Sequence, residues 1–261
     1  MTRSLFAAVA FAFVAASLVG VGLTAERTAP RAEPETGAAV PTPVLVELFT
    51  SEGCSSCPPA DALLRELVGD QPIDGAYVIG LSEHVDYWNR LGWHDPFSSP
   101  SFSARQQTYG RQFQLASIYT PQAIVDGTVE LVGSDRDAVR RAIADAARAP
   151  KAPLSIAVTP EADGVRVVLD GNRVLDQPDT ALVVALVEND LSVHVTSGEN
   201  ASRQLRHSAV ARAMQTVMHG QRSVRLPIDP AWNGTALDVV AFAQDRRTLA
   251  IRAAAIAPLA R

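Results

Sequence analysis

The sequence predicts an α/β domain with an inserted aromatic-rich segment, followed by a mainly antiparallel β-sandwich domain. Three observations predict this fold class. A buried strand, a helix and a second buried strand follow one another between residues 44 and 82, which is the order of a parallel βαβ unit. A hairpin and a helix then precede residue 150. From residue 153 onward, short β-rich segments alternate with turn residues, which is typical of antiparallel sheets.

The composition bounds the class of partner. The chain has 261 residues, of which 47% are hydrophobic, so it is long enough to bury a full core. Its formal net charge is -5, and its Lys and Arg residues are scattered along the chain. No basic surplus is left to neutralise phosphates, so we expect no nucleic-acid partner. Nothing in the sequence indicates the oligomeric state.

The N-terminal region predicts export. Residues 1–25 contain an apolar stretch, Leu5–Val19, directly after a basic start, as an export signal requires. An uncleaved membrane anchor is the alternative, because the run approaches bilayer-spanning length when it is extended through Leu23. Residues 26–43 are rich in Pro, Ala, Thr and Glu and predict a disordered linker. Both readings place the rest of the chain in the periplasm or outside the cell.

The first predicted domain, residues 44–150, opens with the βαβ unit. Residues 44–49 form an almost uninterrupted apolar run, as in a central strand. After the second cysteine, apolar positions recur with helical spacing as far as Gly69. Residues 76–82 predict the next buried strand. Because parallel strands end at the same edge of a sheet, we expect Cys54 at the edge where open α/β sheets place their sites.

An insertion and a hairpin complete this domain. Residues 83–120 predict loops and short helices and carry most of the aromatic residues. Two strands, residues 122–125 and 128–132, flank the turn Asp126-Gly127, which is a strong hairpin signal. A last helix ends before residue 150.

The second predicted domain, residues 151–261, is β-rich. Only residues 208–218 predict a helix there. The predicted strands are residues 154–159, 164–169, 181–187, 192–196, 223–227 and 237–243.

The two cysteines indicate reactivity. A structural disulfide is the ordinary expectation in an oxidising compartment, but so short a loop gains only about 2 kcal/mol, against more than about 4 kcal/mol for a loop of about 100 residues. Cys54-Ser55-Ser56-Cys57 at a strand-to-helix junction therefore indicates thiol chemistry. We expect Cys54 to be the more exposed sulfur and the nucleophile, and Cys57 to resolve a mixed disulfide.

His84 is a further candidate at this edge. It follows the second predicted strand, with Asp86 two residues on. It is expected to relay a proton to Cys57 or to be a third metal ligand beside the two sulfurs. Hydrogen bonds that fix the inserted loop are the structural alternative. His94 and Asp95 are weaker candidates. Glu52 is interpreted as an exposed loop carboxylate, with a base next to the motif as the alternative.

Two further groups of residues are interpreted as structural. The aromatic residues of the insertion are expected to form its own small core, with a groove for a polypeptide as the alternative. Polar residues of the second domain are expected to form a turn network or an interface. The two groups are Trp88, Trp93, Phe97 and Tyr109, and Glu199, Asn200 and His207.

The order of these elements resembles the thioredoxin fold. Tyr119-Thr120-Pro121 looks like its cis-proline segment, and the resemblance implies that Pro121 faces the cysteine pair and leaves the backbone of Thr120 free to bind an extended substrate. Gly53 departs from the pattern, because thioredoxins usually have Trp there, and Ser-Ser replaces Gly-Pro between the cysteines.

Several longer strings resemble a bacterial secreted family catalogued as domain of unknown function 1223. The resemblance runs from about residue 44 to the end of the chain. It implies a thioredoxin-like fold and no settled activity. The strings are Glu47–Asp61, His84–Trp88, Leu91–Phe97, Gly198–Asn200 and Leu205–His207.

Three functions follow as hypotheses. The first is a periplasmic thiol-disulfide oxidoreductase in which Cys54 and Cys57 cycle without a cofactor and react with protein thiols or disulfides. The second is a metal-handling protein that binds copper through Cys54, Cys57 and His84. The third is a binding module that keeps the disulfide without turnover and uses the sandwich domain as its contact surface.

Overall fold

The computed structural model describes residues 40–171 and 173–259, which belong to one compact unit. The predicted export signal and nearly all of the predicted linker lie outside these residues. The first strand begins at Thr42, inside the predicted linker. Among the helices in the described ranges, none has the length and apolar character needed to cross a membrane.

The first half of the chain has the predicted order of strands and helices. Its elements are β1 (Thr42–Thr50), α1 (Pro58–Asp70), β2 (Ala76–His84), the 3-10 helix η1 (Asn89–Leu91), α2 (Pro100–Gln112), β3 (Gln122–Val125), β4 (Val129–Val132) and α3 (Arg136–Ala146). The second half contains β5 (Ser155–Glu161), β6 (Gly164–Asp170), the 3-10 helix η2 (Arg173–Asp176), β7 (Thr180–Glu188), β8 (Leu191–His194), β9 (Gln204–His207), β10 (Val210–Val217), β11 (Ser223–Pro227), β12 (Leu237–Asp245) and β13 (Ile251–Pro258).

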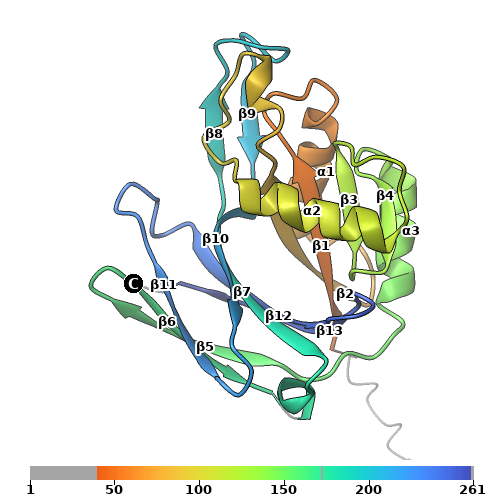
Figure 1. Ribbon diagram of the computed structural model, residues 1–261, viewed down its shortest axis with the longest axis vertical. Helices are drawn as coiled ribbons and strands as arrows, with labels where there is room; N and C mark the ends of the chain where they lie inside the picture. The colour runs from red at the N-terminus through yellow and green to blue at the C-terminus, as the bar shows by residue number, and fades with distance from the viewer. Residues whose placement is uncertain (1–39, 172, 260–261) are drawn as a thin grey trace, which may run out of the picture. The chain divides into compact units, whose positions relative to one another are not determined.

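One eight-stranded sheet, in the order β13-β12-β7-β10-β2-β1-β3-β4, contains strands from both halves (Figure 1). β1 and β2 are parallel, whereas β3 is antiparallel to β1. The halves meet where Val210 of β10 pairs with Ser82 of β2. The sequence places a domain boundary between residues 150 and 151, and the structure pairs strands from both sides of it.

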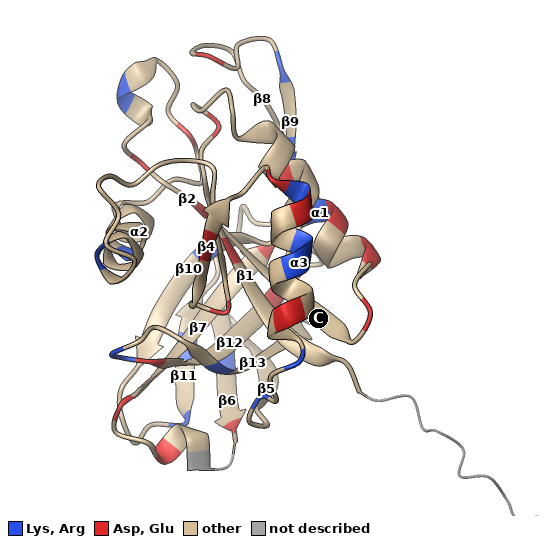
Figure 2. Ribbon diagram, turned by 90° about the vertical axis from the view of Figure 1, so that its right-hand side faces the viewer, with Lys and Arg blue, Asp and Glu red and all other residues tan. Residues whose placement is uncertain are grey.

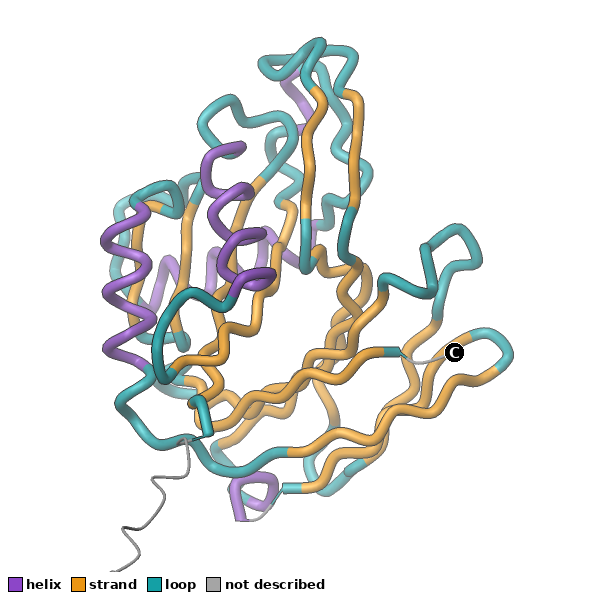
Figure 3. The backbone as a smooth tube through the Cα atoms, turned by 180° about the vertical axis from the view of Figure 1, so that it is seen from behind, coloured by secondary structure: helices purple, strands orange, loops and turns teal. Residues whose placement is uncertain are grey.

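The helices lie on both faces of the first half of the sheet. Apolar side chains of α1 and α3 pack against one face, and α2 lies on the other (Figures 1 and 3). The outward sides of α1 and α3 carry charges of both signs (Figure 2). The residues that α1 and α3 bury against the sheet are Ala60, Leu63, Leu64, Leu67, Val139 and Ile143.

The second half is β-rich, as the sequence predicts. The sheet β11-β6-β5 packs through Val165, Val167 and Leu226 against Val184 and other residues of the large sheet. These features confirm a mixed α/β chain with one large sheet and smaller sheets. β9 and β13 are strands that the sequence analysis missed.

The prediction of a helix over residues 208–218 is wrong. This segment contains strand β10, which pairs with β7 and touches β2. A register shift between Ala211 and Ala213 interrupts its alternation of buried and exposed residues. The strand therefore lacks the two-residue period by which strands are recognised.

A buried ion pair fixes α2 to the sheet. Glu47 of β1 is fully buried, and its carboxylate accepts hydrogen bonds from Arg105 and Tyr109 of α2. Arg105 also donates to the side chain of Gln244 in β12. Both carboxylate oxygens of the neighbouring Glu83 are buried without a hydrogen-bond partner, the nearest cation atom being Arg105 Nε at 3.5 Å. Burial, foremost, raises the pKa of Glu83 well above its usual range.

The predicted hairpin turn also joins the two halves. Asp126 and Gly127 have positive φ angles of 49° and 70°. A Cβ atom on Gly127 would overlap the backbone carbonyl group of Leu249, between β12 and β13. Only glycine allows this approach together with this φ angle.

We predict that Gly127→Ala destabilises the protein by about 2 kcal/mol or more, because it adds positive-φ strain and a backbone overlap. Gly69→Ala is the control, since a Cβ there meets nothing within 4 Å and Ala favours the helix. Urea unfolding curves measure both. If Gly127→Ala lowered the free energy of unfolding no more than the control, the packing described would be contradicted.

We predict that Glu83→Gln stabilises the protein by about 1 kcal/mol or more at pH 7. Because its pKa is raised on folding, Glu83 costs stability as the pH rises above the ordinary glutamate value, where the unfolded chain ionises first. Glutamine keeps the neutral shape at every pH. Unfolding free energies at pH 4 and pH 7 should therefore show an advantage of the variant that grows with pH. An advantage independent of pH would contradict this account.

Candidate functional site

The two cysteines lie in the turn between β1 and α1 and form a disulfide bond. Cys57 directly precedes α1 without a side-chain capping hydrogen bond, and Pro58 and Pro59 occupy the first turn, where a missing N–H group costs little. The expectation that Cys54 is the more exposed sulfur is wrong, because both cysteines have 0% exposure. The exposed residues of the motif are Ser55 and Ser56.

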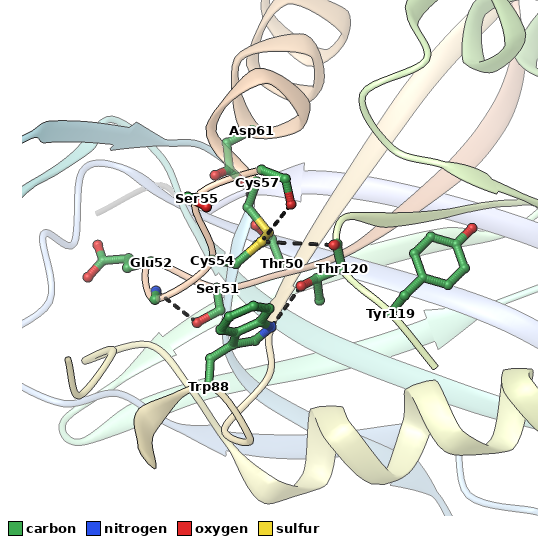
Figure 4. The surroundings of a disulfide bond; sticks show 12 residues. Thr50, Ser51, Glu52, Cys54, Ser55, Cys57, Asp61, Trp88, Tyr119 and Thr120 are labelled. Atoms are coloured by element: carbon green, nitrogen blue, oxygen red, sulfur yellow. Dashed lines mark hydrogen bonds between the residues drawn. A yellow bond between two sulfur atoms is a disulfide. The ribbon is translucent and has the colours of Figure 1, made fainter. Parts of the chain in front are cut away.

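The disulfide faces the segment before β3 (Figure 4). The peptide bond between Thr120 and Pro121 is cis, as the resemblance implied. Cys54 Sγ lies 3.9 Å from Thr120 O and 3.3 Å from Ser56 Oγ. Trp88 donates its indole N–H to Thr120 Oγ1 at 2.8 Å and also lies against Gly53. The cysteine pair, the cis-proline segment and the insertion thus meet at one place.

Glu52 connects the cysteine turn to three other parts of the chain. The prediction that it is an exposed carboxylate is wrong, because its exposure is 0%. Its backbone N–H donates to Asp95 Oδ2 at 2.8 Å, and its carbonyl accepts from Asn200 Nδ2 at 2.8 Å. One carboxylate oxygen accepts from Trp93 Nε1 at 2.8 Å, and the other lies 3.2 Å from His207 Nε2.

His84 is buried behind the turn and bonded to the insertion. Its Nδ1 lies 2.7 Å from Asp95 Oδ2, while its Nε2 is buried without a partner. Burial alone would lower the pKa of His84, but Asp95, with smaller contributions from Asp61 and Glu52, raises it overall. For Asp95, burial opposes ionisation, yet His84 lowers its pKa. Asp86 turns away from this pair and accepts a hydrogen bond from Ser103 Oγ.

Asp61 of α1 belongs to the same buried group. It lies one helical turn after Cys57, whose carbonyl accepts the Asp61 N–H at 3.1 Å. Its carboxylate accepts from Thr50 Oγ1 at 2.8 Å and lies 3.9 Å from His207 Nδ1, which has no hydrogen-bond partner. Burial raises the pKa of Asp61, against the lowering effect of His207 and His84.

A cavity of about 190 Å³ opens between α1 and β9 beside Asp61. Asp61 therefore lies at the wall of a cavity although the residue is almost fully buried. The other lining residues are Pro58, Arg65, Gln204, Leu205 and Arg206.

The tip of the β8–β9 hairpin covers the cysteine turn from the second half of the chain. Glu199 Oε2 accepts from the backbone N–H of Ser55 at 3.0 Å. Asn200 Nδ2 donates to Glu52 O and to Cys54 O at 2.9 Å. The polar residues interpreted as a structural network thus contact the candidate site directly.

The aromatic residues of the insertion pack within the protein. Tyr109 is 1% exposed and stacks on Phe113. The ring of Phe97 lies edge-on to the rings of His84 and His207, with centroids 5.3 and 5.8 Å apart. Their positions support packing as their main role. His94 is exposed at the surface.

Across residues 40–171 and 173–259, no group of three or more His, Cys, Asp or Glu residues has the geometry to hold a metal ion. The two sulfurs are bonded to each other, and His84 is engaged with Asp95.

Sequence reasoning missed Asp61 as a candidate. Its spacing of four residues from Cys57 was the available signal, because such residues share one helix face. No local signal marks the contacts of Glu199 and Asn200 with a turn about 145 residues earlier.

Two solved structures resemble this one. A crystal structure of a protein from Agrobacterium tumefaciens has a TM-score of 0.64 and 28% sequence identity, and the match covers 85% of this chain and 97% of that one. HBP35 of Porphyromonas gingivalis has a TM-score of 0.54 and 14% identity over 85% of this chain and 76% of that one, so it shares the fold alone. Among the curated proteins, none matches this chain.

The family described as "Protein of unknown function (DUF1223)" matches residues 45–244. This range includes the cysteine turn, the insertion and the hairpin tip. It confirms the resemblance seen in the sequence, and the chain belongs to the DUF1223 family.

Proposed function

We propose that this chain is an exported thiol-disulfide oxidoreductase whose first half is thioredoxin-like and whose partners are protein thiols or disulfides. One observation carries the proposal: the Cys54–Cys57 pair lies at the start of α1 and faces the carbonyl of Thr120 beside a cis proline. Export is supported by the sequence of residues 1–25.

The start of α1 favours a thiolate when the pair is reduced. The positive end of the α1 dipole stabilises an anion there, although Pro58 and Pro59 supply no N–H group to it. The hydroxyl of Ser56 is within reach of Cys54 Sγ and can donate to the thiolate. In the neutral reduced form, the Cys54 thiol can donate to Thr120 O.

The exchange balances as two steps. The Cys54 thiolate attacks a partner disulfide, forming a mixed disulfide and releasing one partner thiolate, which takes a proton. Cys57 then loses its proton, and its thiolate attacks Cys54 Sγ, which closes the Cys54–Cys57 bond and releases the second partner thiol. Two electrons and two protons pass from the cysteine pair to the partner, and the reverse sequence oxidises a partner dithiol.

A partner must reach sulfurs that are buried in the oxidised state. Ser55 and Ser56 are exposed next to them, and the Thr120 carbonyl borders the same place. Exchange therefore requires the cysteine turn to shift from the Thr120 segment. We expect a flexible or unfolded partner segment to enter more readily than a folded surface.

Asp61 is suited to accept the proton of Cys57. It stands one turn further along α1, burial raises its pKa, and the cavity beside α1 gives it a route to water. His207, between Asp61 and Glu52, can stabilise its charge.

We predict that Cys57→Ser traps a mixed disulfide with a scrambled or partly unfolded disulfide-bonded protein, because Cys54 attacks and nothing resolves the adduct. Non-reducing gel electrophoresis should show a band that reducing agent removes. Cys54→Ser is the matched control, and the band should be absent from it. Equal trapping by both variants, or by neither, would contradict the proposal.

We predict that Asp61→Asn slows resolution of the mixed disulfide by about tenfold or more at pH 7, since asparagine accepts no proton. The rate in the wild type should fall as the pH drops through the raised pKa of Asp61, where the carboxylate becomes protonated. Stopped-flow measurement of the attack of Cys57 on the mixed disulfide, from pH 5 to 8, gives the rate and its pH dependence in the wild type and in the variant. A pH profile identical in the variant and the wild type would show that Asp61 does not transfer the proton.

A further inference from the structure

The hairpin tip holds the cysteine turn through polar contacts with both polar groups of the peptide unit between Cys54 and Ser55. Glu199 binds the N–H of Ser55, directly after Cys54, and Asn200 binds the carbonyl of Cys54 itself. Glu199 is exposed, whereas Asn200 is fully buried. A carboxylate from the second half of the chain therefore lies beside the candidate nucleophile.

The tip is a folded structure in its own right. Arg203 Nη1 donates to Asn200 Oδ1 at 2.9 Å, and the N–H of Ser202 donates to the carbonyl of Val195 at 2.8 Å. Ser197 Oγ donates to the carbonyl of Gly92 in the insertion at 2.5 Å. These contacts fix the backbone that carries Glu199.

Glu199 differs from the other ionisable groups around Cys54. The others are bonded within the protein, and all of them except the half-buried Tyr119 are buried, whereas Glu199 is exposed. Its hydrogen bonds with Ser55 lower its pKa, so it is ionised at neutral pH. The other groups are Glu52 of the turn, Asp61 of α1, His84 of β2, Asp95 of the insertion, Tyr119 before Pro121 and His207 of β9.

Two effects of Glu199 oppose formation of the Cys54 thiolate. Its negative charge repels a second anion nearby. It also takes up the N–H of Ser55, the residue after Cys54, so this backbone donor is not available to an anion at the turn. Both effects oppose the stabilisation of the Cys54 thiolate by the positive end of the α1 dipole.

We infer that Glu199 is a positioning residue that lowers the thiolate fraction of Cys54 in the reduced protein and so restrains its reactivity. This inference rests on the proposed function, since the reactivity of Cys54 matters only if the cysteine pair exchanges disulfides. The pKa of Cys54 can nevertheless be measured without any partner protein. It assigns the second half of the chain a role in the chemistry of the first.

The test uses the Cys57→Ser chain, in which Cys54 is the one cysteine. Thiolate absorbance at 240 nm is followed against pH in this chain and after adding Glu199→Gln. We expect Glu199→Gln to lower the measured pKa of Cys54 by about 0.5, the effect of one charge a few ångströms away in water-like surroundings. Alkylation by iodoacetamide below both pKa values should then be about twofold faster, because the thiolate fraction rises about threefold while each thiolate becomes less nucleophilic.

Asp74→Asn is the matched control. Asp74 is exposed and lies before β2, and its substitution also removes one negative charge. It should leave the pKa of Cys54 unchanged. No change in Glu199→Gln, or an equal change in Asp74→Asn, would overturn the inference. A shift confined to Glu199→Gln supports it even if the mixed disulfide is not trapped, and that combination would count against the proposed function alone.

Discussion

The candidate site depends on the burial of Glu52. Its carboxylate has no access to water, and its polar atoms are satisfied by the insertion, by His207 of β9 and by the hairpin tip. Removing a partner from a buried charge costs several kcal/mol, so these segments do not separate easily. Cys54 follows Glu52 by two residues in the same turn. The position of this turn is therefore set by contacts from across the chain more than by its own sequence.

Periodicity and turn chemistry predicted most of the strands and helices of the first half. The run of residues 44–49, the helix after Cys57 and the Asp126-Gly127 turn each have a local pattern that the tertiary structure keeps. β10 has no such local pattern, because its register shift breaks the alternation of buried and exposed residues that marks a strand. The join between the two halves passes through β10, so the shared sheet was not predictable from local pattern.

The site was predictable only in part, for a similar reason. The spacing of the cysteines and the resemblance to thioredoxins placed Cys54, Cys57 and Pro121 together. The burial of both sulfurs and of Glu52 follows from residues far along the chain, such as Asn200, and sequence spacing carries no information about such contacts. His84 illustrates the limit, because its position after β2 is as expected while its bond to Asp95 depends on how the insertion folds back.

The shared sheet also sets an order of events for a chain that is synthesised from its N-terminus. Cys54 emerges 146 residues ahead of Asn200. During that interval the cysteine turn has no cover from the second half of the chain. The contacts that enclose the turn are therefore completed only when the hairpin tip arrives.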